Sequence, residues 1–237
     1  MFLLPPEGTV FRHYFLAALF VFALAITACD DGNPAGMGDE PDDARRTIEG
    51  LITEYLPAVY SEMDSAGYAA ALDTSYQFQL LPDDVDPHHP DQDCWDWTAE
   101  MTIAGRMFSG WLNQEAKRIL TIELYLGEES RTALGSSYPG KPHDEVWYEV
   151  VALVDMTVVV WDGAGVGAGE VQPYIVLSRQ EFVVRPDPKD QRKWVIVRQE
   201  DRPYLNKSAG GSGTDEISWG GLKTMFLFGD SYPISSK

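Results

Sequence analysis

The stretch between Trp147 and Trp161 constrains the fold most, because its side chains alternate in character over its whole length. All of its even-numbered residues, from Tyr148 to Val160, are apolar, whereas its odd-numbered residues include charged and hydroxyl side chains. In a β-strand, successive side chains point to opposite faces of the sheet. The pattern therefore predicts a long strand with a buried even-numbered face, as in an antiparallel sheet that is covered on one side.

Other strands are predicted on both sides of this one. From Lys117 onward the period is also two, and the apolar residues at even positions run through Leu126. Two further strands are predicted at Tyr174–Arg185 and Trp194–Asp201, with the proline-containing segment 186–190 as the turn between them. The C-terminal half is therefore expected to form a sheet of long antiparallel strands.

Helices are expected before this sheet. Apolar residues recur at steps of three and four over Ile48–Met63, which is the period of an amphipathic helix, and Pro57 should kink or divide it. Asp42 or Asp43 can cap its start, and Asp64 can cap a second helix. The remaining predicted elements are a short strand at Tyr76–Leu81, a helix at Trp97–Phe108 that begins at Asp96 or Thr98, and a last ordered element at Ile217–Phe228.

Two segments resemble a known family. Asp64–Phe78 resembles the second helix and first strand of NTF2-like (SnoaL-like) domains, and Lys193–Asp201 is similar to a late strand of that superfamily. The resemblance implies an α+β fold, a cone in which N-terminal helices pack on a curved antiparallel sheet around a pocket. The superfamily includes isomerases, dehydratases, cyclases and transport factors, so the fold alone does not indicate a function.

The N-terminus has the features of an export signal. Tyr14–Ala28 is apolar apart from Thr27, and it is shorter than a membrane-spanning helix requires. The run ends in Ile-Thr-Ala-Cys, which resembles the lipobox of bacterial lipoproteins with Cys29 as the lipidated residue. The alternative is an ordinary signal peptide with an incidental cysteine. The resemblance implies a protein anchored through its lipid on the periplasmic side of the cell envelope, and Asp30 favours the inner membrane.

The charge distribution separates a tether from a folded domain. Two acidic stretches, 30–43 and 83–96, hold twelve carboxylates and account for most of the net charge of −19. This acidity argues against nucleic acid as a partner, since phosphate binding needs a basic surface. We expect a signal peptide at residues 1–28, an acidic flexible tether at 29–43, and a single NTF2-like domain at 44–237.

Two segments look like ligand sites, and both are predicted to be ordinary loops. Asp83–Asp96 contains His88, His89 and Cys94, but its spacing and prolines match neither zinc nor calcium sites. The glycine-rich segment 163–169 formally matches a dinucleotide fingerprint, yet a strand follows it where that fingerprint opens a helix. We therefore predict no metal and no cofactor.

Four residues are candidates to line the pocket that the fold implies: Tyr174, Ser178, Gln180 and Trp194. Ser178 and Gln180 are polar residues on an otherwise apolar strand face, and a buried polar group must find a partner. A β-bulge would place them on the opposite face instead. No residue matches the catalytic roles of the family's enzymes, so none is assigned as catalytic.

Three functions remain open at this point. The first is a non-catalytic, lipid-anchored module that binds a small hydrophobic ligand or a protein. The second is a small-molecule isomerase, dehydratase or hydrolase that uses the same pocket, and the third is a structural lipoprotein that forms a homodimer through the odd-numbered sheet face. An acid with a raised pKa facing an aromatic hydroxyl would favour the enzyme. A pocket filled by side chains would favour the binding module.

Overall fold

The computed structural model describes residues 41–85, 93–111, 113, 116–163, 169–202 and 218–227. The segment between Trp147 and Trp161 forms an inner strand of a six-stranded sheet. The strand order is β2-β1-β6-β5-β4-β3, and neighbouring strands are antiparallel except for β1 and β6, which are parallel. The strands are β1 (Leu72–Gln79), β2 (Cys94–Asp96), β3 (Lys117–Ala133), β4 (Tyr148–Asp162), β5 (Glu170–Pro186) and β6 (Trp194–Arg202).

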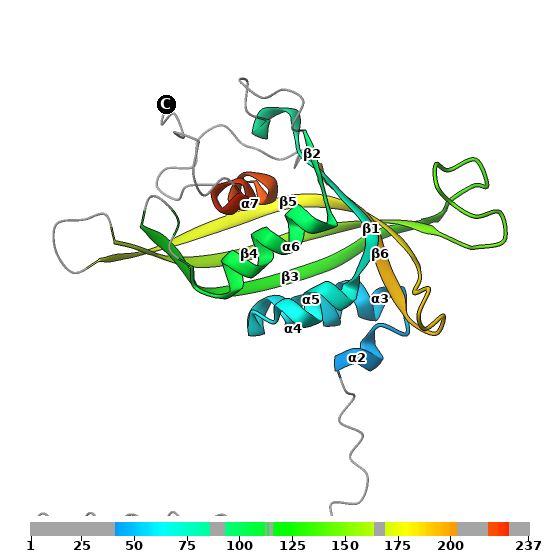
Figure 1. Cartoon of the computed structure of the whole chain (residues 1–237), viewed down its shortest axis with the longest axis horizontal. Coiled ribbons are helices and arrows are strands. Elements are labelled where there is room, and N and C mark those ends of the chain that lie inside the picture. Colours follow the sequence, from blue (N-terminus) through cyan, green and yellow to red (C-terminus); the bar gives the residue numbers. More distant parts are fainter. Residues whose placement is uncertain are drawn as a thin grey trace, which may run out of the picture. The chain divides into compact units, whose positions relative to one another are not determined.

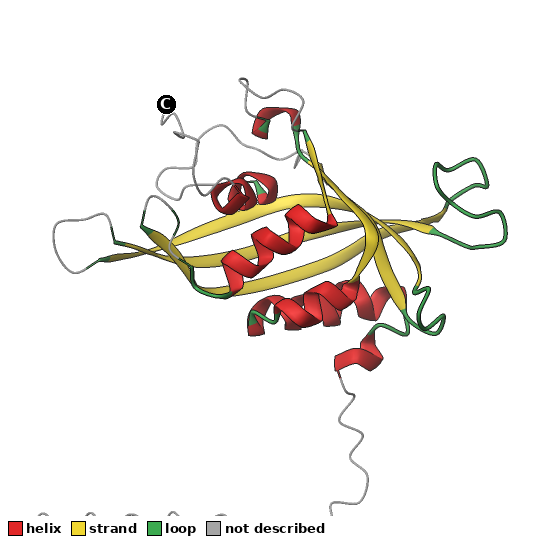
Figure 2. Ribbon diagram, viewed as in Figure 1, coloured by secondary structure: helices red, strands yellow, loops and turns green. Residues whose placement is uncertain are grey.

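The helices lie against the curved strands, as Figures 1 and 2 show. This α+β arrangement confirms the predicted fold class, and it is the one that the resemblance to NTF2-like domains implied. Cys29, His88 and His89 lie outside the described residues. The helical elements are α2 (Pro41–Ala44), α3 (Ile48–Gly50), a π-helical turn (Leu51–Tyr55), α4 (Leu56–Glu62), α5 (Ser65–Ala71), a 3-10 turn (Pro82–Asp84), α6 (Trp97–Phe108) and α7 (Trp219–Leu227).

The core forms between the helices and the even-numbered face of β4. Val150, Ala152, Val154 and Met156 are all at most 1 % exposed. The predicted burial of this face is therefore confirmed. The opposite face is open: Tyr125 and Leu177 flank Asp155 in one cross-strand row, and their exposed fractions are 64 % and 42 %.

Proline changes the first long helix without ending it. A wide π-helical turn directly precedes Leu56 and Pro57, and the helix continues to Glu62. In a regular α-helix the proline ring would clash with the carbonyl group of Thr53, and the wider turn relieves that contact. Helix α3 is capped by Thr47, whose side chain accepts a hydrogen bond from the Gly50 N–H. The cap is therefore not Asp42 or Asp43.

Residues assigned to the acidic tether belong partly to the folded region. Helix α2 begins at Pro41, and the carboxylate of Asp42 pairs with Lys193 and with Arg45. Arg45 is buried and also binds Asp187 at 2.9 Å. These ion pairs join residues 42 and 45 to the turn between β5 and β6, so the end of the predicted tether packs against the domain.

The acidic loop also contains a strand that the sequence pattern does not predict. Residues Cys94–Asp96 form β2 and pair with the end of β1. The Trp95 ring is buried and stacks on Phe78 at 4.5 Å between centroids. Burying this aromatic surface favours an ordered strand in a segment whose aspartates suggested a solvated loop. The caps at Asp64 and Asp96 and the bounds of α6 are as predicted.

Replacing Val154 with Asp should destabilise the domain by at least about 3 kcal/mol, because it places a carboxylate without a partner in the apolar core. The same replacement at Thr157, on the open face of the same strand, should cost less than about 1 kcal/mol. Urea unfolding of the two variants measures the difference. Equal losses would contradict the assignment of the two faces.

Candidate functional site

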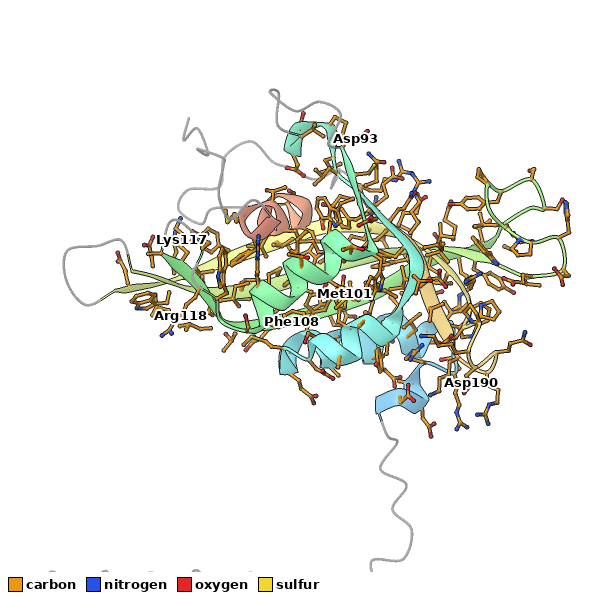
Figure 3. All side chains as sticks on the ribbon, in the orientation of Figure 1. Asp93, Met101, Phe108, Lys117, Arg118 and Asp190 are labelled. Atoms are coloured by element: carbon orange, nitrogen blue, oxygen red, sulfur yellow. The ribbon has the colours of Figure 1, made fainter. Side chains whose placement is uncertain are left out.

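Eight buried side chains form a polar cluster between the helices and the sheet, and we call it the interior polar cluster. It has two parts that share helix α7. One part is centred on a carboxylate of α6, and the other is a chain of amides that ends at a carboxylate of β6. Figure 3 marks α6 by Met101 and Phe108. The members are Tyr68, Tyr76, Trp95, Glu100, Gln180, Gln199, Asp201 and Lys223.

Glu100 is the centre of the first part, and it is completely buried. Its Oε1 accepts hydrogen bonds from the Tyr68 hydroxyl and the Lys223 ammonium, each at 2.6 Å. Its Oε2 accepts one from the Trp95 indole N–H, also at 2.6 Å. Both carboxylate oxygens are therefore bound by donors of the protein itself, as a buried charge requires.

Lys223, on α7, places a positive charge next to the Glu100 carboxylate. Its ammonium lies 4.3 Å from the centre of the Phe78 ring and 4.8 Å from that of Trp219, so two aromatic rings contact the cation. Burial lowers the pKa of Lys223, and the charge of Glu100 acts in the opposite direction. With Glu100, these rings form a cation cage.

The second part is a relay of amide groups. The Tyr76 hydroxyl donates to the side-chain carbonyl of Gln199 at 2.9 Å, and the Gln199 amide donates to that of Gln180 at 2.6 Å. The Gln180 amide donates in turn to Oδ1 of Asp201 at 3.0 Å. The backbone N–H of Gly220, in the first turn of α7, donates to Oδ2 at 2.6 Å. Helix α7 is thus bound by both carboxylates.

Burial shifts the pKa values of several groups in the cluster. It raises the pKa of Asp201 to about 7, against the opposing effects of the Gly220 N–H, the Lys223 charge and the Gln180 amide. The pKa values of Tyr60, Tyr68 and Tyr76 also rise, first through burial and then through the negative charge of Glu100. These phenols stay protonated, and those of Tyr68 and Tyr76 donate hydrogen bonds to Glu100 and Gln199.

A small cavity lies beside the cluster. Its volume is about 10 Å³, which leaves room for about one water molecule. The indole N–H of Trp219 is buried without a hydrogen-bond partner, and Trp219 belongs to the cavity wall. A water or a ligand acceptor there would satisfy it. The wall consists of Leu56, Tyr60, Tyr68, Leu124, Leu126, Val154, Gln180, Phe182, Gln199 and Trp219.

Of the four residues predicted to line the pocket, only Gln180 lies in the wall of this cavity. Gln180 lies in the cavity wall, and Ser178 is buried on the same strand face, where its hydroxyl has no hydrogen-bond partner. Tyr174 is buried farther along β5, with its hydroxyl bonded to Gln172, and Trp194 packs against Tyr148. Neither Tyr174 nor Trp194 belongs to the cavity wall.

Sequence reasoning missed the charged members of the cluster, although a signal was present. Glu100 precedes Ile103, Ala104 and Met107 by three, four and seven residues, so helical periodicity places it on the buried face of α6. Lys223 lies four residues after Trp219 and three before Phe226, on the buried face of α7. A charged residue at an apolar position of a helix indicates an interior ion pair.

Other kinds of site are not found in the described part of the chain. Within residues 41–85, 93–111, 113, 116–163, 169–202 and 218–227, no group of three or more His, Cys, Asp or Glu could hold a metal ion. Over the same ranges, no helix combines the length and the apolar character that crossing a bilayer requires. Cys94 is a free, exposed cysteine.

Comparisons with known proteins give similarity at the level of structure only. No protein-family model matches the chain, and no curated protein sequence matches it. Among solved structures, a conserved protein from Planctomyces limnophilus is 9 % identical with a TM-score of 0.39, over 63 % of this chain and 89 % of that one. A ketosteroid isomerase-like protein from Erwinia carotovora atroseptica is 11 % identical with a TM-score of 0.37, over 69 % of this chain and 99 % of that one. The association domain of C. elegans CaMKII is 13 % identical with a TM-score of 0.30, over 62 % of this chain and 87 % of that one.

Replacing Gly220 with Ala should weaken the docking of α7. A Cβ atom at this position would lie 2.6 Å from a methyl group of Leu80 and 3.0 Å from Oδ2 of Asp201. We expect a loss of about 2 kcal/mol of unfolding free energy from this overpacking. Gly105→Ala, in α6, is the matched control, because nothing lies within 4 Å of its Cβ position. It should stabilise the protein by about 0.5–1 kcal/mol, and similar losses in both variants would refute the close contact at Gly220.

The raised pKa of Asp201 predicts a pH dependence of stability. Because its pKa is about 7 in the folded state against 3.8 ordinarily, the folded protein retains a proton that the unfolded chain loses. This contribution to stability is fully present below about pH 4 and is lost as the pH rises to about 7. The unfolding free energy of Asp201→Asn, relative to that of the native protein, should therefore rise by a few kcal/mol between pH 4.5 and 7.5. Urea unfolding at both pH values measures this, and parallel pH profiles would contradict it.

Proposed function

We propose that this chain is a lipoprotein of the bacterial cell envelope, and that its folded domain is a binding module for a small ligand rather than an enzyme. The observation that carries the second part is that α7 fills the interior, with Lys223 bound to Glu100 at 2.6 Å. The cavity beside the cluster has room for about one water molecule. No substrate fits there unless protein groups move.

A catalytic acid of the expected kind would have a raised pKa and contact an aromatic hydroxyl, but in this cluster each acid has only one of these two properties. Asp201 has the raised pKa, but its oxygens contact the Gln180 amide and the Gly220 N–H. Glu100 contacts the aromatic hydroxyl of Tyr68, but its charge is paired with Lys223. A general acid or base must reach the proton that it transfers, and neither carboxylate has an oxygen free of protein donors. This arrangement supports binding over catalysis.

A ligand screen with product analysis tests the choice between binding and catalysis. The full-length protein is screened against small molecules by thermal shift, and each compound that stabilises it is recovered and identified by mass spectrometry. Stabilising compounds that are recovered unchanged support a binding module. Conversion of a compound, lost in Asp201→Asn or Glu100→Gln, would instead establish an enzyme. A screen without any stabilising compound would count against both functions.

Lipidation is tested on the two cysteines of the chain. The lipobox-like sequence predicts that the mature protein begins at a lipid-modified Cys29 and separates with membranes. Cys29→Ser should abolish the lipid mass and leave the precursor unprocessed. Cys94→Ser, which changes a free cysteine of the folded domain, should leave both unaltered. An unlipidated N-terminus at another residue in the native protein would exclude the lipid anchor.

A further inference from the structure

We infer that the cation cage occupied by Lys223 is a binding site for a primary alkylammonium ligand, which replaces this side chain when α7 moves away. The inference rests on the proposed binding function and names the chemical class of its ligand. In the structure, the four-carbon side chain and ammonium of Lys223 are the occupant whose chemistry such a ligand would copy.

Two of the three groups of the cage, Glu100 and Phe78, lie outside α7, whereas the third, Trp219, belongs to that helix and moves with it. Glu100 belongs to α6, and donors from α5 and β2 hold its two oxygens at 2.6 Å. Phe78 belongs to β1, and the Trp95 ring stacks behind it with an angle of 12° between the ring planes. A carboxylate and an aromatic face are thus already positioned for a cation, so these two groups need little rearrangement, and the cost of binding lies in moving α7.

The charge of the site selects the ligand. When Lys223 leaves, Glu100 becomes a buried carboxylate without a counter-charge, which is strongly unfavourable. An ammonium restores both the ion pair and the contact with the face of Phe78. A neutral molecule of the same size restores neither, and an anion would be repelled by Glu100. A primary ammonium also has an N–H group that can donate a hydrogen bond to Glu100 Oε1, whereas a quaternary ammonium has none.

Holding α7 in place does not by itself account for a lysine here. Leu222 and Phe226 already bury apolar side chains of this helix, and Gly220 and Ser218 bind Asp201 and Asp84. A buried ion pair contributes little net stability compared with apolar residues of similar volume. Trp219, which belongs both to the cage and to the cavity wall, also has an indole N–H without a partner, so α7 does not satisfy every polar group that it buries.

Competition with Lys223 can be measured with n-butylammonium as the probe. Its affinity for the full-length protein is determined by calorimetry, with n-butanol, butyrate and tetramethylammonium as comparison compounds. Lys223→Met keeps an unbranched side chain, one heavy atom shorter, and removes its charge. It should bind n-butylammonium at least about tenfold more tightly than the native protein does, because the internal competitor is gone. The double variant Lys223→Met/Glu100→Gln should lose this gain.

A second measurement on a protein that retains Lys223 guards against a variant that fails to fold. Leu222 is completely buried on α7, so Leu222→Cys in a Cys94→Ser background should react slowly with a thiol reagent. Saturating n-butylammonium should accelerate labelling at position 222, read by peptide mass spectrometry, and n-butanol should not. Acceleration supports replacement of the lysine by the ligand.

Several results would overturn the inference. They are equal affinity of n-butylammonium for the native and Lys223→Met proteins, equal binding of n-butanol, a gain that survives Glu100→Gln, or unchanged labelling of position 222. If the ligand screen finds other compounds but amines fail these tests, the amine site is refuted and the binding function stands. If neither screen nor probe detects binding, both fail.

Discussion

A carboxylate removed from water must be met by donors and a counter-charge, and Glu100 imposes this condition on the whole interior. Its three donors come from α5, β2 and α7. Three elements that are separate in the sequence are therefore coupled through one charge. Loss of any one donor would leave the carboxylate partly unsatisfied, which makes the docking of each element depend on the others.

The sequence predicts the frame of the molecule because the frame follows from local periodicity. The alternation around Val154 identifies a long strand and its buried face, and Asp64 and Asp96 cap helices where they were expected. Each of these features depends on neighbours within a few residues. Strand β2 depends instead on Trp95 reaching Phe78, a contact between two segments, and the composition of the loop gave no indication of it.

The candidate site was less predictable for the same reason. Periodicity places Glu100 and Lys223 on the buried faces of their helices, but it does not say which acid meets which base. The two residues are 123 positions apart, and only the packed arrangement of α6, α7 and β1 brings them together. Gln180 was recognised as a polar residue on a buried face, whereas its partners Gln199 and Asp201 come from the neighbouring strand.

Acids, amides and phenols of the kind found in acid–base sites are all present in this interior, but their hydrogen bonds are already made. A ligand that binds to these groups must therefore exchange with a protein group rather than add to it. Exchanging one hydrogen bond for another changes the free energy little, so the number of polar contacts does not determine which ligand binds. The charge of the ligand determines it instead, because a buried carboxylate without a counter-charge costs far more free energy than a displaced neutral donor. Among the groups of α7 that a ligand could replace, Lys223 is therefore the one whose chemistry the ligand has to reproduce.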